Sequence, residues 1–171
     1  RLAKAKNKDV SDIVVAILDR PRHVGLIREV HEAGASTRLM LDGDVAGGIQ
    51  AAMYGSRIDM CAGTGGSPEG IVTTCAIKAL GGFIQGVLAP KDEAEKARGL
   101  AAGLKFDHVY EADELVASDN TIFVATGVTD GALVQGVRVK GPIIRTDSIV
   151  LRGKSGTIRR VQADYLAERW I

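Results

Sequence analysis

The sequence predicts an α/β protein built on a parallel β-sheet. Short apolar, β-branched runs alternate with stretches of helical periodicity in the first half of the chain, and this alternation is typical of strand–helix–strand units. The second half instead holds strand-like segments between glycine turns. The 171 residues are 46% hydrophobic and 25% charged, which suits one domain with its own core. We expect a helix tail or linker at 1–10, the parallel part at 12–90 and a strand-rich extension at 91–171.

The first predicted strand is the apolar run DIVVAIL at residues 12–18, which is typical of a strand buried on both faces. A helix is predicted over residues 19–34. Pro21 suits a first helical position, and Gly34 favours a helix end. The apolar stripe of this helix consists of Leu26, Ile27 and Val30.

Two further strand–helix units follow in the chain. Residues 36–41 predict the second strand, and we expect Asp44 to cap the helix after it. Residues 58–63 predict a third strand that runs into a glycine turn. Ser67 is expected to cap the next helix, with Pro68 at its first position.

The remaining predicted elements lie between residue 81 and the end of the chain. Residues 81–88 predict a fourth strand of the parallel sheet, and residues 91–103 predict a charged surface helix. Beyond them we expect an antiparallel extension. Its predicted strands lie in TIFVATGV, GVRVKG, PIIRTDSIVLRG and GTIRRVQADY.

The composition argues against two classes of binding partner, nucleic acid and anionic membranes. A net charge of +1 and 4% aromatic residues argue against nucleic-acid binding and against attraction to an anionic membrane. No apolar run approaches the roughly 18 residues of a membrane span. Two cysteines without metal-type spacing favour a reduced, cytoplasmic protein. An exposed sheet edge also argues against a lone monomer.

Polar residues cluster where three predicted strands end. The clusters are DRPR at 19–22, DGD at 42–44 and GTGGSPE at 63–69. Because ligands of parallel sheets bind outside the carboxyl ends of the strands, we expect these clusters to line one site.

Glu69 has two interpretations. A carboxylate in the first turn of a helix complements the helix dipole, worth roughly 0.3–1 kcal/mol. Alternatively, Glu69 is a ligand of a divalent cation, since Mg²⁺ takes few carboxylates together with phosphate oxygens. A glycine turn before a helix also suits a phosphate. One carboxylate cannot form such a site alone, so the other ligands must come from elsewhere.

The arginines and aspartates also leave alternatives open. Arg20 and Arg22 flank Pro21, where cations are unfavourable at a helix N-terminus. They are either solvated or paired with an anionic ligand, because the guanidinium fork matches phosphate oxygens. Asp42 and Asp44 either shape the turn and cap the helix or accept hydrogen bonds from sugar hydroxyls.

The other reactive residue types are assigned structural roles. We expect His23 to be a surface residue of its helix rather than a catalyst. Cys61 and Cys75 are expected to be small buried hydrophobes rather than nucleophiles. The basic run at 152–160 is interpreted as a solvated or intersubunit face.

Six ordered motifs resemble those of the class II fructose-1,6-bisphosphatases, from about residue 12 to residue 162. They are DRPRH, DGDVA, GTGGSPEG, KALGG, SDNTIFVATGVTDG and RGKSGTIRR. The resemblance implies a layered α-β-α-β-α sandwich of the sugar phosphatase and inositol monophosphatase type. It also implies Mg²⁺- or Mn²⁺-dependent hydrolysis of the 1-phosphate of fructose 1,6-bisphosphate, a gluconeogenic step, by a homo-oligomer (dimer or tetramer). Some members also hydrolyse sedoheptulose 1,7-bisphosphate.

The resemblance also implies roles for individual residues. Glu69 would be a metal ligand, and Gly66 would bind substrate through its backbone. Thr64 stands where the family commonly has an aliphatic residue. The other substrate-binding residues would be Arg20, Pro21, Arg22, Asp42, Gly43 and Asp44.

The resemblance leaves one motif unmatched. The family's Asp-Pro-x-x-Gly-Thr stretch, whose threonine helps to activate the attacking water, has no counterpart in this sequence. We therefore expect the chain to be the C-terminal half of the enzyme, with no catalytic residue of its own and active only with the N-terminal segment.

Two functions of other classes stay open at this point. The unmatched half is compatible with a non-catalytic sugar-phosphate-binding or regulatory module. The glycine turn after a strand is compatible with a Rossmann domain for a nucleotide or methyl donor. That interpretation is weaker, because Pro68 and Glu69 would place a negative charge against a pyrophosphate.

Overall fold

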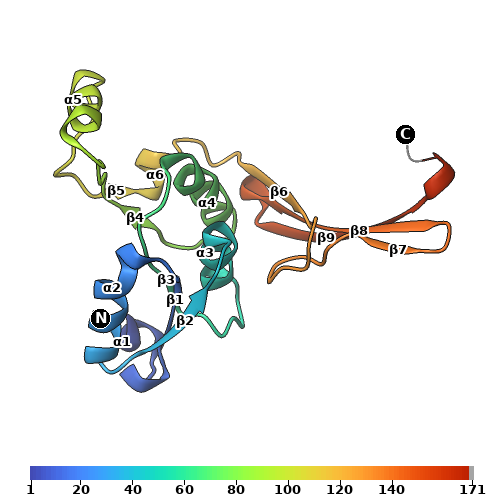
Figure 1. The fold of residues 1–171 in the computed structure, drawn as a ribbon, viewed down its shortest axis with the longest axis horizontal. Helices are drawn as coiled ribbons and strands as arrows, with labels where there is room; N and C mark the ends of the chain where they lie inside the picture. The colour runs from blue at the N-terminus through green and yellow to red at the C-terminus, as the bar shows by residue number, and fades with distance from the viewer. Residues whose placement is uncertain (170–171) are drawn as a thin grey trace.

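The computed structural model describes residues 1–169 and stacks most of them in alternating layers of helix and sheet (Figure 1). Helix α2 (Val24–Glu32) covers the outer face of a parallel sheet, and helix α3 (Asp44–Ala52) covers the inner face. Helix α4 (Ser67–Ala79) packs beside α3 and contacts a second, antiparallel sheet. The chain is thus a mixed α/β protein, as predicted.

The parallel sheet has the order β2-β1-β3. Strand β1 (Val14–Leu18) lies between β2 (Ser36–Met40) and β3 (Met60–Cys61) and runs parallel to both. Val15 and Ile17 belong to the core beneath α2. Because side chains alternate along a strand, Ala16 between them faces α3. The first two predicted strands are confirmed, whereas the third is shorter than predicted.

Helix α2 packs and ends as predicted, but it begins at Val24, because Pro21 instead begins a short 3₁₀ helix (Pro21–His23). Its apolar stripe of Leu26, Ile27 and Val30 packs against the core under the sheet. The helix ends before Gly34, whose φ of 86° is a conformation that favours glycine. The Gly34 and Ala35 amides donate to the His31 and Val30 carbonyls, which closes the last turn.

Helices α3 and α4 form the middle layer, between the two sheets, and they pack closely against each other. Gly48 of α3 is buried, and a Cβ atom at this position would lie 2.7 Å from Cγ2 of Thr73 in α4. Glycine therefore sets the separation of α3 and α4. The core between this layer and the antiparallel sheet consists of Ile49, Ala76, Ala79, Phe123, Leu133, Ile149 and Leu151.

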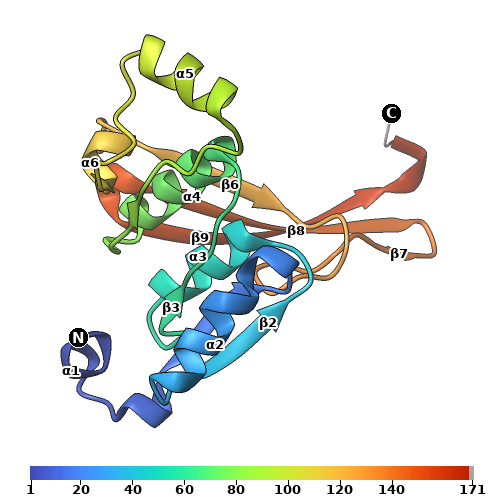
Figure 2. The same cartoon turned by 60° about the vertical axis from the view of Figure 1, so that its left-hand side comes forward.

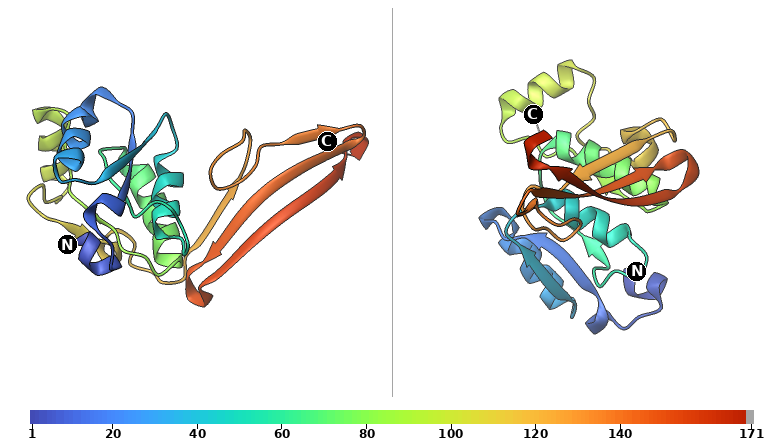
Figure 3. Two further views of the ribbon diagram at one scale, coloured as in Figure 1. Left: turned by 90° about the horizontal axis from the view of Figure 1, so that it is seen from below. Right: turned by 90° about the vertical axis from the view of Figure 1, so that its right-hand side faces the viewer.

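The predicted antiparallel extension is confirmed. Its central strand β8 (Ile143–Arg152) pairs with β9 (Thr157–Leu166) on one side and with β6 (Ile122–Thr126) and β7 (Arg138–Lys140) on the other. The far ends of these strands project away from the helices (Figure 3, left).

The prediction of a fourth parallel strand at residues 81–88 is wrong. After α4 the chain turns at Gly81 and Gly82, whose amides donate to the Lys78 and Ile77 carbonyls. The chain then pairs only through β4 (Gln85–Gly86), antiparallel to β5 (Tyr110–Glu111), in a separate sheet. The other helices are α1 (Leu2–Lys6), α5 (Glu93–Ala101) and α6 (Ala112–Leu115). None of the described helices is long and apolar enough to cross a membrane.

The two predicted helix caps are each displaced by one residue. Gly43, with a φ of 86°, occupies the N-cap of α3, and Gly66 occupies the N-cap of α4. Asp44 and Ser67 are instead the first helical residues, and neither helix has a side-chain cap. The Asp44 side chain instead accepts a hydrogen bond from the adjacent Val45 amide, at 2.9 Å.

A buried carboxylate ties the first residues to the sheet. The Asp59 side chain is 2% exposed and accepts hydrogen bonds from Lys8 Nζ at 2.7 Å and from the Val14 amide at 3.0 Å. Lys6 Nζ lies 3.3 Å away. Burial alone would raise the pKa of Asp59, but the bonds from Lys8, Val14 and Lys6 outweigh it, and the pKa is lowered from 3.8.

An Asp59→Asn variant is expected to lower the free energy of unfolding at pH 7 by about 1–3 kcal/mol, because the amide cannot pair with both lysines. A carboxyl with a depressed pKa stabilises the fold above its unfolded pKa and loses this contribution as the pH falls through its folded pKa. The wild type should therefore lose stability below pH 3.8, and the variant should lose less. Urea titrations between pH 7 and acid measure both effects.

The matched control is Asp9→Asn, at an exposed aspartate in the same segment. It should change the unfolding free energy by no more than about 0.5 kcal/mol. Equal behaviour of the two variants would contradict the role of Asp59.

Candidate functional site

The three polar clusters converge at the carboxyl edge of the parallel sheet. Residues 19–23 follow β1, residues 42–44 follow β2, and residues 63–69 follow β3 and begin α4. We call these three segments the rim. Direct contacts join each segment to another, as expected from their positions at the carboxyl ends of three predicted strands.

The first contact joins Arg20 to Asp42. Arg20 Nη2 donates to Asp42 Oδ1 at 2.7 Å, and Arg20 Nη1 donates to the Asp19 carbonyl at 3.0 Å. The Asp42 side chain is 90% exposed, so this ion pair is solvated and of small energy. It links the segments after β1 and β2 but adds little to the stability of the fold.

The second contact joins the first segment to the glycine turn through Thr64. Arg22 Nε donates to the Thr64 carbonyl at 2.8 Å. The Thr64 amide donates to Nε2 of His23, also at 2.8 Å. Both bonds use the main chain of Thr64, so the side chain at this position is free to differ from the family's aliphatic residue.

The prediction that His23 is a surface residue is wrong. It is 2% exposed, and Nδ1 lies 2.8 Å from the Leu18 carbonyl at the end of β1. Because Nε2 accepts from Thr64, the proton lies on Nδ1, which donates to Leu18. A Cβ atom at Gly63 would lie 3.0 Å from the ring. His23 is therefore a buried bridge between β1 and the glycine turn, and it requires glycine at position 63.

The third contact places Asp44 beside the glycine turn. A Cβ atom at Gly65 would lie 3.0 Å from Asp44 Oδ2. Asp44 also acts on Cys61, whose pKa is raised to about 11, mainly by burial and further by the charge of Asp44. Cys61 is thus a thiol near neutral pH, as its predicted inert role requires, although both cysteines are only partly buried.

Glu69 lies at the open end of the rim. Its carboxylate folds back over Gly66, the N-cap residue of α4. No side chain of the described residues caps this helix, so the amides of its first turn remain available to an anion. Residues 63–70 are all exposed.

Glu69 fits a hard cation as one ligand only. Carboxylate oxygens are the donors that Mg²⁺ and Mn²⁺ prefer. Within residues 1–169, however, no group of three or more His, Cys, Asp or Glu is placed to hold a metal ion. These described residues alone therefore do not form a metal site with three protein ligands.

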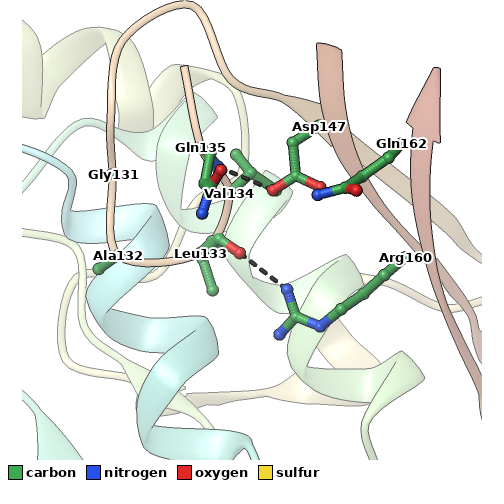
Figure 4. A pocket seen from close by; sticks show the side chains of 8 residues that line it. All are labelled: Gly131, Ala132, Leu133, Val134, Gln135, Asp147, Arg160 and Gln162. Carbon is green, nitrogen blue, oxygen red and sulfur yellow. Dashed lines mark hydrogen bonds between the residues drawn. The ribbon is translucent and has the colours of Figure 1, made fainter. Parts of the chain in front are cut away.

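A separate hollow lies away from the rim. It has a volume of about 660 Å³ and lies between the loop before β7 and strands β8 and β9 (Figure 4). Asp147 there accepts from the Gln135 amide at 2.8 Å, and Arg160 donates to the Leu133 carbonyl at 3.0 Å. These polar groups hold the loop in place, and no rim residue lines this hollow. The rim therefore remains the candidate site.

The sequence relates this chain to one family of known proteins. The chain matches the family described as bacterial fructose-1,6-bisphosphatase, glpX-encoded, over residues 1–165. Fructose-1,6-bisphosphatase class 2 of Haemophilus influenzae is 38% identical, over 95% of this chain and 53% of that protein. Fructose-1,6-bisphosphatase 1 class 2 of Escherichia coli is 39% identical, over 98% of this chain and 54% of that protein. The chain thus spans about half the length of the curated relatives it matches.

A His23→Leu variant is expected to lower the free energy of unfolding by about 2–4 kcal/mol, because it leaves the Leu18 carbonyl and the Thr64 amide without partners. Urea unfolding measures the loss. The control is His31→Leu, since His31 makes an exposed hydrogen bond to Thr37 in the same part of the chain. An equal loss of unfolding free energy in both variants would contradict the stabilising role of the His23 bridge.

Proposed function

Since the chain belongs to the family of bacterial, glpX-encoded fructose-1,6-bisphosphatases, we propose that it supplies the substrate-binding edge and one metal ligand of such an enzyme. The complete enzyme hydrolyses the 1-phosphate of fructose 1,6-bisphosphate to fructose 6-phosphate and phosphate. Sedoheptulose 1,7-bisphosphate is a second proposed substrate. The observation that carries the proposal is the convergence of three strand-end clusters on one rim.

The arginines and the glycine turn are proposed to bind phosphate. Arg22 uses only Nε on Thr64, so its terminal nitrogens can form a bidentate pair with phosphate oxygens. Pro21 restricts the backbone between Arg20 and Arg22. The Gly66 amide at the start of α4 adds a donor of the kind that phosphates favour.

The segment after β2 is proposed to recognise the sugar. Asp42, Gly43 and Asp44 form a tight turn, with a φ of 86° at Gly43. The carboxylates accept hydrogen bonds from hydroxyl groups, and Asp42 is oriented for this by Arg20. Asp44 is oriented by the Val45 amide. Each carboxylate therefore has one oxygen in a hydrogen bond and a second oxygen that is proposed to accept from the sugar.

Glu69 is proposed to hold one Mg²⁺ or Mn²⁺ ion. When bound, such an ion polarises a phosphoryl group and lowers the pKa of a bound water. This chain's own part is to place one charged oxygen beside the amides of α4, where phosphate and cation can be neighbours. The residue that activates the attacking water is proposed to lie in the N-terminal segment.

The assembly is proposed to be a cytoplasmic homo-oligomer, a dimer or tetramer, in which this chain is active only with that segment. The basis is the family membership together with the match to about half of each relative. The five-layer α-β-α-β-α sandwich is proposed for the complete enzyme.

The second candidate function is a sugar-phosphate-binding module without catalysis. The absence of a three-ligand metal group from residues 1–169 favours it. Calorimetric titration of the chain with fructose 1,6-bisphosphate distinguishes the two. Micromolar binding without metal is the expected result for a module, whereas the enzyme proposal predicts no such binding by the chain alone.

A Glu69→Gln variant of the complete enzyme tests the metal ligand. Loss of an outer partner of a metal ligand already costs about 10–100-fold in affinity, so loss of a charged ligand should raise the Mn²⁺ dissociation constant at least about 100-fold. Phosphate release should fall with it, and Mn²⁺ titration gives a readout independent of turnover.

The control is Glu93→Gln, because Glu93 also lies in the first turn of a helix, α5. Both variants lose a dipole interaction of roughly 0.3–1 kcal/mol, but only the change at Glu69 should alter metal binding. Unchanged Mn²⁺ affinity in Glu69→Gln would remove Glu69 from the site.

A further inference from the structure

Thr64 combines a fixed main chain with a side chain that has no assigned role. It lies in the connection from strand β3 to helix α4 (Figure 2). Its carbonyl accepts from Arg22 Nε and its amide donates to His23 Nε2, each at 2.8 Å. The main chain is therefore held from both sides, and threonine is also stiff at χ1. Little conformational freedom is left for a ligand of this residue to remove.

The hydroxyl of Thr64 is available to a ligand. The residue is exposed, and its hydroxyl has no hydrogen-bond partner among residues 1–169. A hydroxyl group can both donate and accept hydrogen bonds, so the groups around it decide which of the two it does.

Arg22 places a cation beside Thr64. Because Nε bonds to the Thr64 carbonyl, the planar guanidinium begins at this residue, and its terminal nitrogens lie only two covalent bonds further on. A phosphate bound by these nitrogens is then within reach of the Thr64 hydroxyl. Toward such an anion the hydroxyl donates, and charge-assisted hydrogen bonds of this kind are short and strong.

The glycine turn separates this position from the proposed metal ligand. Glu69 folds back over Gly66, two residues beyond Thr64, whereas Arg22 contacts the turn at Thr64 itself. The turn thus has a cationic end and an acidic end. A metal ion on Glu69 attracts the phosphoryl group that is transferred, so Arg22 and Thr64 are left for the other phosphate, at the opposite end of the sugar.

We propose that Thr64 is a substrate-binding residue whose hydroxyl donates a hydrogen bond to the 6-phosphate held by Arg22. The inference rests on the proposed function and names a determinant of affinity within the same rim. Because the 6-phosphate is retained in the product, Thr64 sets the binding of the unreacting end of the substrate rather than the rate of the chemical step.

A sugar hydroxyl is the competing partner of Thr64. Asp44 Oδ2 lies beside the next residue, Gly65, so the proposed sugar-binding carboxylate is close to the turn. The phosphate is the better fit, because Arg22 contacts Thr64 itself and because a hydroxyl binds an anion more strongly than a neutral group.

The test compares Thr64→Val and Thr64→Ser in the complete enzyme, with fructose 6-phosphate as the probe. Valine keeps the shape of threonine without the hydroxyl, and serine keeps the hydroxyl. Thr64→Val should raise the calorimetric dissociation constant of fructose 6-phosphate at least about tenfold, through loss of one hydrogen bond to a charged group. KM for fructose 1,6-bisphosphate should rise similarly, with kcat changed less than about twofold. Thr64→Ser should restore the wild-type values.

The control is Thr129→Val, because Thr129 is also exposed but lies outside the rim. It should leave the affinity for fructose 6-phosphate unchanged. Mn²⁺ titration should give the wild-type affinity in all three variants, since Glu69 is intact. Circular dichroism and urea midpoints check that each variant folds.

Unchanged affinity of Thr64→Val for fructose 6-phosphate would overturn the proposal. An altered preference between six- and seven-carbon bisphosphates, with that affinity unchanged, would overturn it by assigning the hydroxyl to the sugar. A wild-type enzyme that binds fructose 6-phosphate without hydrolysing the bisphosphate would contradict the proposed function alone, because the effect of Thr64→Val on binding is still measured. A wild-type enzyme that does not bind fructose 6-phosphate would contradict both.

Discussion

The rim depends on one buried imidazole. The His23 ring joins the Leu18 carbonyl, at the end of β1, to the Thr64 amide, beyond the end of β3. The ring is rigid and 2% exposed, so it fixes the spacing of these two strand ends. Arg22 adds a second bond to the same residue. Gly66 and Glu69 follow within five residues of Thr64, and their positions are set by this bridge.

The sequence predicted several local features correctly, although the N-caps of α3 and α4 each lie one residue earlier than predicted. The apolar run of β1, the stripe of α2 and its end at Gly34 each follow from neighbouring residues. His23 was misjudged because its partner Thr64 is 41 residues away. Strand β4 was misplaced because its partner β5 comes late in the chain. The convergence of the rim was predictable from strand ends, but the pairing of Arg20 with Asp42 is a tertiary contact that no local pattern encodes.

Helix α4 connects the candidate site to the antiparallel sheet. Its first turn carries Glu69, and its side contacts β6 and β8. Its last turn is held by Lys78, which pairs with Asp113 at 2.7 Å and Asp119 at 3.0 Å. The hydrogen bonds that Lys78 donates to these two carboxylates raise its pKa. Helix α4 is therefore held at its last turn and along its side, while its first turn carries Glu69 into the rim.

The charge of the rim decides between the two functions proposed for it. Its segments contain Arg20 and Arg22 but also Asp19, Asp42, Asp44 and Glu69, and the hydrogen bonds of His23 require a neutral ring. Carboxylates therefore outnumber cationic side chains. A bisphosphate carries several negative charges, and Coulomb repulsion from an exposed acidic edge opposes its binding. Added cations remove this conflict, because each offsets a carboxylate and attracts a phosphate. The rim is thus better suited to binding substrate together with metal than to binding it alone, which favours the phosphatase over a metal-free binding module.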